Sequence, residues 1–315
     1  MRKNDSDIRI LGNARLLDSH PAVILNSRHG KYPKGDDPWV KNTISAVKSA
    51  ISMGRSVIAS VGMNTWELAL WAAGEYGGSV IIILPKTKQT EIVNNMEYFM
   101  QDFNLKLDRC ALIFIDSSPG TRGKKGWWEN RDNLAFDLAY EIMPVSIRDD
   151  GRWNTILNSP LIKAKKVYCG FQIKYQNATE KMKMVIEIPS SGISYNWDYI
   201  THWTRRFSGP WPGEKSADFY RAIAFGGINY PRSADATLER ILSENLLRGS
   251  SSWMKNNKTA VSFTQLPPLK ATELMKYRKR YVRYTFEPFG IAIKKDAARE
   301  TGIKPVEYIE KTRGL

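Results

Sequence analysis

The first half of the chain alternates short apolar runs with longer amphipathic segments. Apolar runs of strand length are bounded by Gly, Ser, Asn and Asp, and the segments between them place apolar residues on one helical face. Strands joined through helices pair in parallel through right-handed crossovers. We therefore predict a Rossmann-like α/β parallel sheet, with strands at Ala22–Asn26, Ser56–Val61, Val80–Leu84, Ala111–Asp116 and Met143–Arg148, and helices at Pro38–Met53, Thr65–Tyr76, Gln89–Phe103 and Asn130–Tyr140.

The second half has a different rhythm, without regular alternation. A polar stretch near Asp149–Pro160 separates the two, so we predict domains at 1–158 and 159–315, the second of the α+β class. Its expected helices are Ala217–Phe225 and Ser233–Asn245, the latter capped by Ser233. Its expected strands are Lys166–Ile173, Lys183–Ile188, Tyr199–Arg205, Ala260–Thr264, Tyr281–Glu287 and Gly290–Lys294.

Small polar and basic residues follow the strands of the predicted parallel sheet. The carboxyl ends of parallel strands meet at one edge, where helix N-termini offer amide donors to phosphate. Gly62 lets the backbone approach an anion, and Asn64 or Thr65 can cap the next helix. A short Gly turn also occurs where strand and helix merely pack tightly. The expected nucleotide or phosphate contacts are Asn26, Ser27, Arg28, Ser60, Gly62, Asn64, Thr65, Glu67, Lys86, Ser117 and Arg148.

The charge of the chain favours a polyanionic partner. It has 47 Lys and Arg against 32 Asp and Glu, a formal charge of +15 and a pI of about 9.6. Nucleic acid or a nucleotide is the first expectation, single-stranded DNA in particular, and anionic membrane is the second. The run Lys276–Tyr284 interleaves basic and aromatic residues, although such runs are also common on solvated surfaces. Its candidate contacts are Lys276, Arg278, Lys279, Arg280 and Arg283.

A glycine-rich basic loop runs from Ser117 to two tryptophans at 127 and 128. Glycines and proline exclude regular structure there, so the loop is either a flap over the sheet edge or a surface loop plugged by its tryptophans. In the flap reading, Lys124, Lys125 and Trp127 contact nucleic acid.

Other composition features narrow the class of protein. Cys110 and Cys169 each lie in an apolar run and are expected to be buried thiols, and the three histidines have no zinc-ligand spacing, so we expect no metal. The sequence shows neither a signal peptide nor a membrane span, and we expect a cytoplasmic protein with no membrane partner. Its oligomeric state is left open.

The first 150 residues resemble a known superfamily. Asn26-Ser27-Arg28 after the first strand, then Ser60-x-Gly62-x-x-Thr65 before a helix, are similar to the DNA-processing protein A family. Gly62-Met63-Asn64-Thr65-Trp66-Glu67 also resembles the glycine-rich motif of the related cytokinin-activating phosphoribohydrolases. The resemblance implies a Rossmann-like nucleotide-binding fold. Asn26 stands where the first family has glycine, and the second family's motif has lost glycines here, so binding is expected more than hydrolysis.

A second resemblance lies in the carboxy-terminal half. His202-x-Thr204, the helix end at Ile241-Leu242 and the segment Val261–Thr264 are similar to ADP-ribosyltransferase folds, and Tyr281–Tyr308 resembles domains of bacterial abortive-infection proteins. The resemblance implies NAD as the cofactor, with His202 on a ribose hydroxyl, Ser262 bracing the catalytic strand and Glu287 as the catalytic carboxylate. Other glutamates compete for that role, and an ordinary strand histidine remains an alternative for His202.

Three functions stay open on the sequence. One is a two-domain protein of antiviral defence, in which a nucleotide- or DNA-sensing first domain controls an NAD-consuming second domain by ADP-ribosyl transfer or NAD hydrolysis. Another is a non-enzymatic protein that binds single-stranded DNA. The last is an enzyme that cleaves an N-glycosidic bond or modifies a base at the edge of the first sheet.

Overall fold

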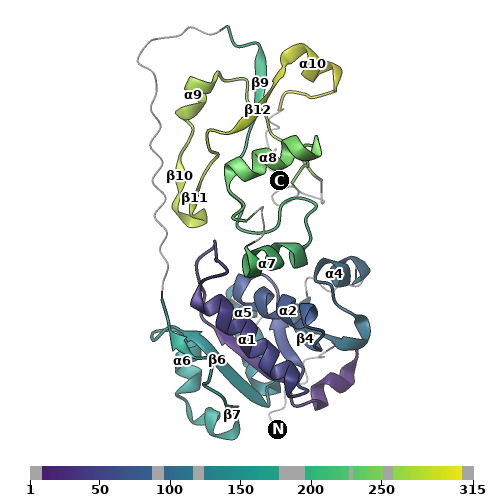
Figure 1. Cartoon of the computed structure of the whole chain (residues 1–315), viewed down its shortest axis with the longest axis vertical. Coiled ribbons are helices and arrows are strands. Elements are labelled where there is room, and N and C mark those ends of the chain that lie inside the picture. The colour runs from purple at the N-terminus through teal and green to yellow at the C-terminus, as the bar shows by residue number, and fades with distance from the viewer. Residues whose placement is uncertain are drawn as a thin grey trace, which may run out of the picture. The chain divides into compact units, whose positions relative to one another are not determined.

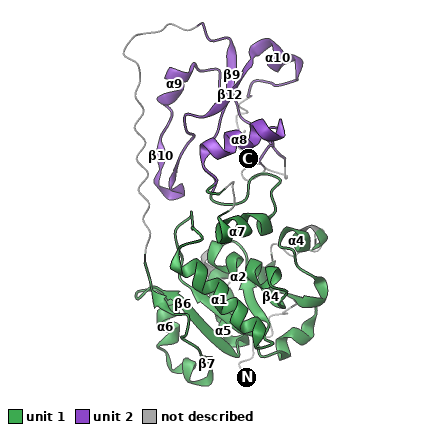
Figure 2. Ribbon diagram, viewed as in Figure 1, with its two compact units in different colours: residues 1–180, 208–231 green, residues 181–207, 232–315 purple. Residues whose placement is uncertain are grey.

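The computed structural model describes residues 9–86, 96–115, 124–176, 196–226, 230–250 and 258–306. The chain divides into two compact units, which Figure 2 shows in different colours. Unit 1 comprises residues 1–180 and 208–231, and unit 2 comprises residues 181–207 and 232–315. The boundary expected after residue 158 thus falls inside unit 1, which continues to residue 180 and takes a further segment from the second half.

Unit 1 is built on an eight-stranded, mostly parallel sheet (Figure 1). The order is β1-β5-β4-β3-β2-β6-β7, with β8 also pairing β6, and β1 is antiparallel to β5. The predicted Rossmann-like α/β fold is confirmed. The strands are β1 (Arg9–Gly12), β2 (Ala22–Asn26), β3 (Val57–Ser60), β4 (Val80–Pro85), β5 (Cys110–Ile115), β6 (Glu141–Ile147), β7 (Lys166–Val167) and β8 (Ile173–Lys174).

Both faces of this sheet are covered, which explains why its strands are continuous apolar runs. Alternate residues of β2 point to opposite faces, so Ile24 packs in one core cluster and Val23 and Leu25 in the other. The first face carries α1 (Pro38–Ser52), α2 (Asn64–Glu75) and α4 (Met96–Asp102), and the second carries α5 (Lys124–Leu138), α6 (Arg152–Leu157) and the 3-10 turn η1 (Ala14–Asp18).

A helix from the second half of the chain completes unit 1. We expected residues 217–225 to lie in the carboxy-terminal domain, but α7 (Ser216–Phe225) packs its buried Phe219, Tyr220 and Ile223 into the core of unit 1. The Arg221 guanidinium pairs with Glu75 of α2 at 2.7 Å. The local amphipathic pattern predicted the helix correctly, but it contains nothing that says which sheet the apolar face covers.

The strands expected around residue 170 also belong to unit 1. The segment predicted as one strand, Lys166–Ile173, forms the two short strands β7 and β8, and both pair with β6. The expected strand Lys183–Ile188 lies outside the described residues.

The two cysteines differ in environment. Cys110 is buried at the start of β5, as predicted, and burial raises the pKa of its thiol to about 12. The prediction for Cys169 was wrong, because this thiol is exposed in the segment between β7 and β8. The strands β7 and β8 are only two residues long, and the apolar residues directly before Cys169, Val167 and Tyr168, are also exposed.

Unit 2 contains small sheets and short helices, in agreement with the α+β prediction. Its strands are β9 (Tyr199–Trp203) antiparallel to β12 (Gly290–Lys294), and β10 (Tyr277–Arg278) antiparallel to β11 (Arg283–Tyr284). Its helices are α8 (Ala234–Glu244), α9 (Pro268–Thr272) and α10 (Lys295–Glu300). Ser233 caps α8 as predicted, since its Oγ accepts the Ala236 N–H.

Two strands expected in unit 2 do not form as predicted. Residues 260–264 make only single bridges, between Ala260 and Ser250 and between Thr264 and Thr201. The expected strand Tyr281–Glu287 is interrupted, because a 3-10 turn (Lys279–Tyr281) and a left-handed Val282 leave only two residues in β11.

The two units differ in how much apolar surface they bury. Both apolar core clusters lie in unit 1. Among the described residues of unit 2, Ile200 is the only buried apolar side chain larger than alanine. Across the described parts of the chain, no helix is both long and apolar enough to cross a membrane.

Candidate nucleotide and nucleic-acid sites

The carboxyl ends of β2 and β6 come together as the sequence predicts. The Ser27 hydroxyl oxygen accepts the backbone N–H of Arg148 at 2.9 Å, and the Ser27 N–H donates to Ser146 in β6. Asn26 is buried at the end of β2 and donates its side-chain N–H to Thr43 of α1 at 2.9 Å. These polar side chains therefore join strands and helix, and do not face solvent.

The turn between β3 and α2 is occupied by a carboxylate from its own helix. Gly62 has a φ of +92°, and its N–H donates to Glu67 Oε1 at 2.6 Å. The Tyr220 hydroxyl of α7 donates to Glu67 Oε2 at 2.6 Å. Burial raises the pKa of Glu67, while these two hydrogen bonds oppose the rise. The Gly62 N–H that we expected to meet a phosphate therefore holds a side-chain carboxylate.

The other predicted side chains of this turn are buried or bonded to the backbone of unit 1. The Ser60 hydroxyl is fully buried and donates to the Ile83 carbonyl oxygen of β4. Asn64 donates to the Gly30 carbonyl oxygen at 2.8 Å, which fixes the loop that follows β2. The Thr65 hydroxyl is buried and has no hydrogen-bond partner within the described part of the chain.

Three exposed cations remain at the carboxyl edge. Arg28 is exposed and forms no ion pair within the described residues, and Lys86 is exposed directly after β4. Arg148 pairs with Asp150 at 2.6 Å, with both side chains at least half exposed. Ser117 lies outside the described residues, and for Lys124 and Lys125 the structure describes the backbone of α5 alone. Among the described residues, Arg28, Lys86 and Arg148 are thus the predicted phosphate contacts with exposed side chains.

His29, in the loop after β2, belongs to an aromatic cluster that we did not predict. The His29 ring stacks on Trp39 with a centroid distance of 4.5 Å and an interplanar angle of 4°, and Tyr175 lies 5.1 Å away. The Tyr175 hydroxyl donates to the Arg28 carbonyl oxygen. Burial lowers the pKa of His29 to about 4, so the ring is neutral at physiological pH. The position of His29, directly after Asn-Ser-Arg, was the one sequence signal that could have suggested it.

Trp127 does not offer a free stacking face. We expected an irregular loop up to the tryptophans, but α5 already begins at Lys124 and contains Trp127. Trp127 is 8% exposed, and the Arg131 guanidinium lies 5.3 Å from the centroid of its ring and 4.9 Å from that of Trp66. Arg131 in turn is held by Asp132 at 2.7 Å. The alternative in which the tryptophan packs against its own domain describes Trp127 better than the flap.

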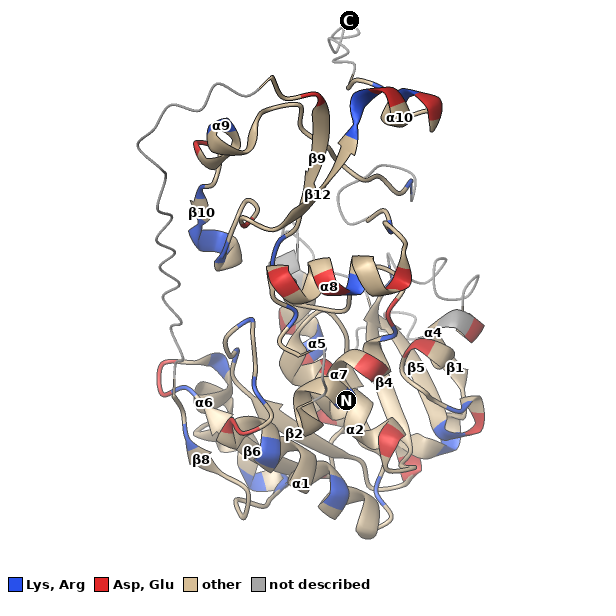
Figure 3. Cartoon of the chain, turned by 45° about the horizontal axis from the view of Figure 1, so that its top comes forward, with Lys and Arg blue, Asp and Glu red and all other residues tan. Residues whose placement is uncertain are grey.

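The basic cluster of unit 2 forms an exposed hairpin. β10 and β11 pair Tyr277 with Tyr284 and Arg278 with Arg283. All five residues from 276 to 280 are exposed. Figure 3 shows the basic colouring on β10 and the turn that follows it. Lys276, Arg278 and Lys279 make no ion pair within the described residues. We call residues 276–284 the basic hairpin.

Aromatic rings lie among these cations. The Tyr277 and Tyr284 rings form an edge-to-face pair at 5.3 Å, and Tyr277 remains 38% exposed. Arg283 is less available, because it donates to the Arg206 carbonyl oxygen and lies 5.5 Å from the Tyr281 ring centroid. The hairpin therefore combines accessible positive charge with an accessible aromatic ring.

The residues expected to act on NAD have structural partners in unit 2. His202 Nδ1 lies 2.9 Å from the Ser262 carbonyl oxygen, and burial lowers the pKa of the imidazole. Glu287 is buried and accepts the Arg206 N–H at 3.1 Å, and burial raises the pKa of its carboxyl group. Ser262 meets His202 through its backbone. Each of these hydrogen bonds fixes the chain locally.

Known proteins resemble this chain only in part. No protein-family model matches it, and no curated protein does either. Among solved structures it is similar to DNA processing protein A from Helicobacter pylori, described for its single-stranded DNA binding mode, with a TM-score of 0.34 and 12% identity over 48% of this chain and 65% of that chain. It is also similar to DNA processing protein A from Streptococcus pneumoniae, with a TM-score of 0.33 and 13% identity over 51% of this chain and 62% of that chain. The match spans less than two thirds of either protein.

Proposed function

We propose that this chain binds single-stranded nucleic acid and that the basic hairpin of unit 2 provides the main contact. The observation that carries the proposal is the exposure of all five residues from Lys276 to Arg280, four of them cationic. Lys276, Arg278 and Lys279 have no acidic partner within the described residues. Cations that are not already neutralised can each displace counterions from a phosphate backbone.

The distribution of charge supports unit 2 as the binding unit. Unit 2 contains 21 Lys and Arg against 11 Asp and Glu, a formal charge of +10. Unit 1 is nearly twice as long but has 26 Lys and Arg against 21 Asp and Glu, a formal charge of +5. An excess of one sign over a short stretch of chain raises the local concentration of an oppositely charged partner.

The aromatic residues of the hairpin favour single strands over duplex. A base can stack on the exposed Tyr277 ring only when it is unpaired and free to leave its own stack. Such stacking contributes about 1–3 kcal/mol per base and depends little on sequence. We therefore expect binding that prefers single strands and tolerates many sequences.

Unit 1 offers a second candidate contact for phosphate. Arg28 and Arg148 follow neighbouring strands, and the Ser27–Arg148 hydrogen bond holds the two strand ends together. Arg28 is the better candidate, because Arg148 already pairs with Asp150. A bidentate arginine–phosphate contact suits a nucleotide as well as a strand. A role in antiviral defence and NAD consumption by unit 2 remain predictions of the sequence resemblance.

Fluorescence anisotropy with labelled oligonucleotides tests this proposal. We expect the full chain to bind a 20-nucleotide single strand more tightly than the matching duplex at low salt. The double change Lys279→Glu and Arg280→Glu should weaken single-strand binding about tenfold or more, because it replaces two phosphate contacts by repulsion.

A matched control changes the same charge elsewhere in unit 2. Lys294→Glu with Arg299→Glu reverses two exposed cations outside the hairpin. This control should lose far less affinity than the hairpin variant. Equal losses in both variants would mean that net charge alone attracts the strand, and an unchanged affinity of the hairpin variant would exclude the hairpin.

A further inference from the structure

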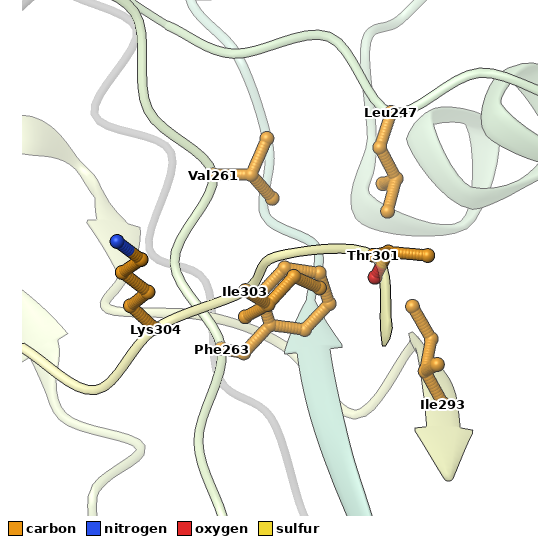
Figure 4. Close-up of a pocket in the computed structure, with 7 residues that line it drawn as sticks. All are labelled: Leu247, Val261, Phe263, Ile293, Thr301, Ile303 and Lys304. Carbon is orange, nitrogen blue, oxygen red and sulfur yellow. The ribbon is translucent and has the colours of Figure 1, made fainter. Parts of the chain in front are cut away.

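Unit 2 contains a partly open cavity of about 400 Å³ (Figure 4). Its lining comes from the segment after α8, the segment before Thr264, strand β12 and the chain after α10. This volume lies within the range of pockets that hold small organic molecules. The apolar lining residues are Leu247, Val261, Phe263, Ile293 and Ile303.

The walls of this cavity are fixed by backbone pairing. Thr264 and Thr201 exchange backbone hydrogen bonds at 2.8 and 2.9 Å, which ties the segment carrying Val261 and Phe263 to β9. The Phe263 ring is also supported by the His202 ring, 5.7 Å away. Ile293 is held in β12 opposite Ile200. The cavity therefore belongs to the paired framework of unit 2.

The polar groups of the cavity favour one sign of charge. Lys304 lines the cavity, is exposed, and makes no ion pair within the described residues. The Thr301 hydroxyl donates its hydrogen to the Ala297 or Ala298 carbonyl oxygen, so it can only accept a hydrogen bond from a ligand. No acidic residue lines the cavity within the described part of the chain. An anionic group beside Lys304 and an apolar body against the five apolar side chains fit this lining.

We propose that the cavity binds a small amphipathic anion, an aliphatic carboxylate of about eight to twelve carbons. Burying its chain removes apolar surface from water on both sides. The gain matters in unit 2, where Ile200 is the only buried apolar side chain larger than alanine in the described part. The carboxylate pairs with the Lys304 ammonium at the cavity. This site is independent of the proposed nucleic-acid contact.

Isothermal titration calorimetry of the full chain with decanoate tests the site. Decanoate should bind with a stoichiometry of one, and decyltrimethylammonium, which has the same chain and the opposite charge, should bind at least tenfold more weakly. Equal affinity for the two amphiphiles, or no decanoate binding at millimolar concentration, would overturn the proposal.

Substitutions locate the binding. Val261→Trp fills the cavity and should reduce decanoate affinity at least tenfold. Lys304→Gln removes the cation and should reduce it about three- to fivefold, as expected for an exposed ion pair. Lys294→Gln, an exposed lysine of β12 outside the lining, is the matched control and should bind as the wild type does. Circular dichroism establishes that each variant is folded. A folded Val261→Trp variant with wild-type affinity would overturn the site, and if that variant does not fold, equal losses in Lys304→Gln and Lys294→Gln would do so.

Discussion

Unit 1 and unit 2 differ in which side chains they bury and which they leave exposed. Unit 1 buries large apolar side chains on both faces of its mostly parallel sheet. Its polar side chains Ser27 and Ser60 join neighbouring strands, and Asn64 holds the loop after β2. In the described part of unit 2, Ile200 is the only buried apolar side chain larger than alanine, and every cation except Arg206 and Arg232 is exposed or half-buried. The polar side chains of unit 1 that already bond within the fold are poorly available to a ligand. The exposed cations of unit 2 are the better candidates for a binding surface.

The largest effect that we expect is a difference in stability when the same substitution is made in each unit. Ile82 in β4 is fully buried and Ile200 in β9 is 6% exposed. We expect Ile82→Ala to lower the free energy of unfolding by about 4 kcal/mol and Ile200→Ala by about 2 kcal/mol. The loss is smaller at Ile200 because its surroundings are less densely packed and can relax into the space that the substitution leaves. Urea unfolding measures the loss of free energy in each variant, and hydrogen exchange measures it within each unit.

Hydrogen exchange also provides the control for that experiment. Each substitution should speed exchange mainly in its own unit. Equal losses of free energy, spread evenly over both units, would contradict the claim that unit 1 holds the main core.

The same contrast explains how much the sequence could predict. Strands β2 to β6 of unit 1 were predicted to within about two residues, because a strand buried on both faces is an uninterrupted apolar run. In unit 2, Ala260–Thr264 and Tyr281–Glu287 have strand-like composition but no continuous face to cover, so they form bridges and a short hairpin. The edge strand β1 was missed because it is short and lies in a charged segment.

The candidate site shows a similar limit. That Asn26, Ser27 and Arg148 lie at one edge followed from the parallel arrangement of the strands and was predictable. The bond between Tyr220 and Glu67 was not, because 153 positions separate them and no local pattern links α7 to α2. That bond helps to hold a carboxylate where we expected a phosphate.

A smaller effect should appear in the pH dependence of unit 1. Burial lowers the pKa of His29 to about 4, against an ordinary value of 6.5. Between these pH values the unfolded chain takes up a proton that the folded chain refuses, so stability falls as pH decreases from about 6.5 to about 4. His29→Phe keeps a ring on Trp39 and should make stability flatter in this window, as measured by urea unfolding. The same slope in both proteins would exclude His29 as the cause.

A change at Glu287 should have a still smaller effect on stability. In Glu287→Gln the amide oxygen still accepts the Arg206 N–H, so we expect a change in unfolding free energy of about 1 kcal/mol or less. Nicotinamide release from NAD, measured with wild type and variant, tests the ADP-ribosyltransferase prediction at the same position. Release that disappears in a stable variant would support that prediction, and no release from the wild type would contradict it.

The salt dependence of single-strand binding tests most directly whether the basic hairpin holds the nucleic acid. The hairpin change Lys279→Glu with Arg280→Glu alters exposed residues, so unfolding free energy should stay within about 0.5 kcal/mol of the wild type. If the hairpin holds the strand, the slope of log Kobs against log salt should become shallower by about 1.4, or about 0.7 for each phosphate that the variant no longer neutralises. The control Lys294→Glu with Arg299→Glu should keep the wild-type slope. Three parallel lines would contradict the account, because the strand would then be held elsewhere on the chain.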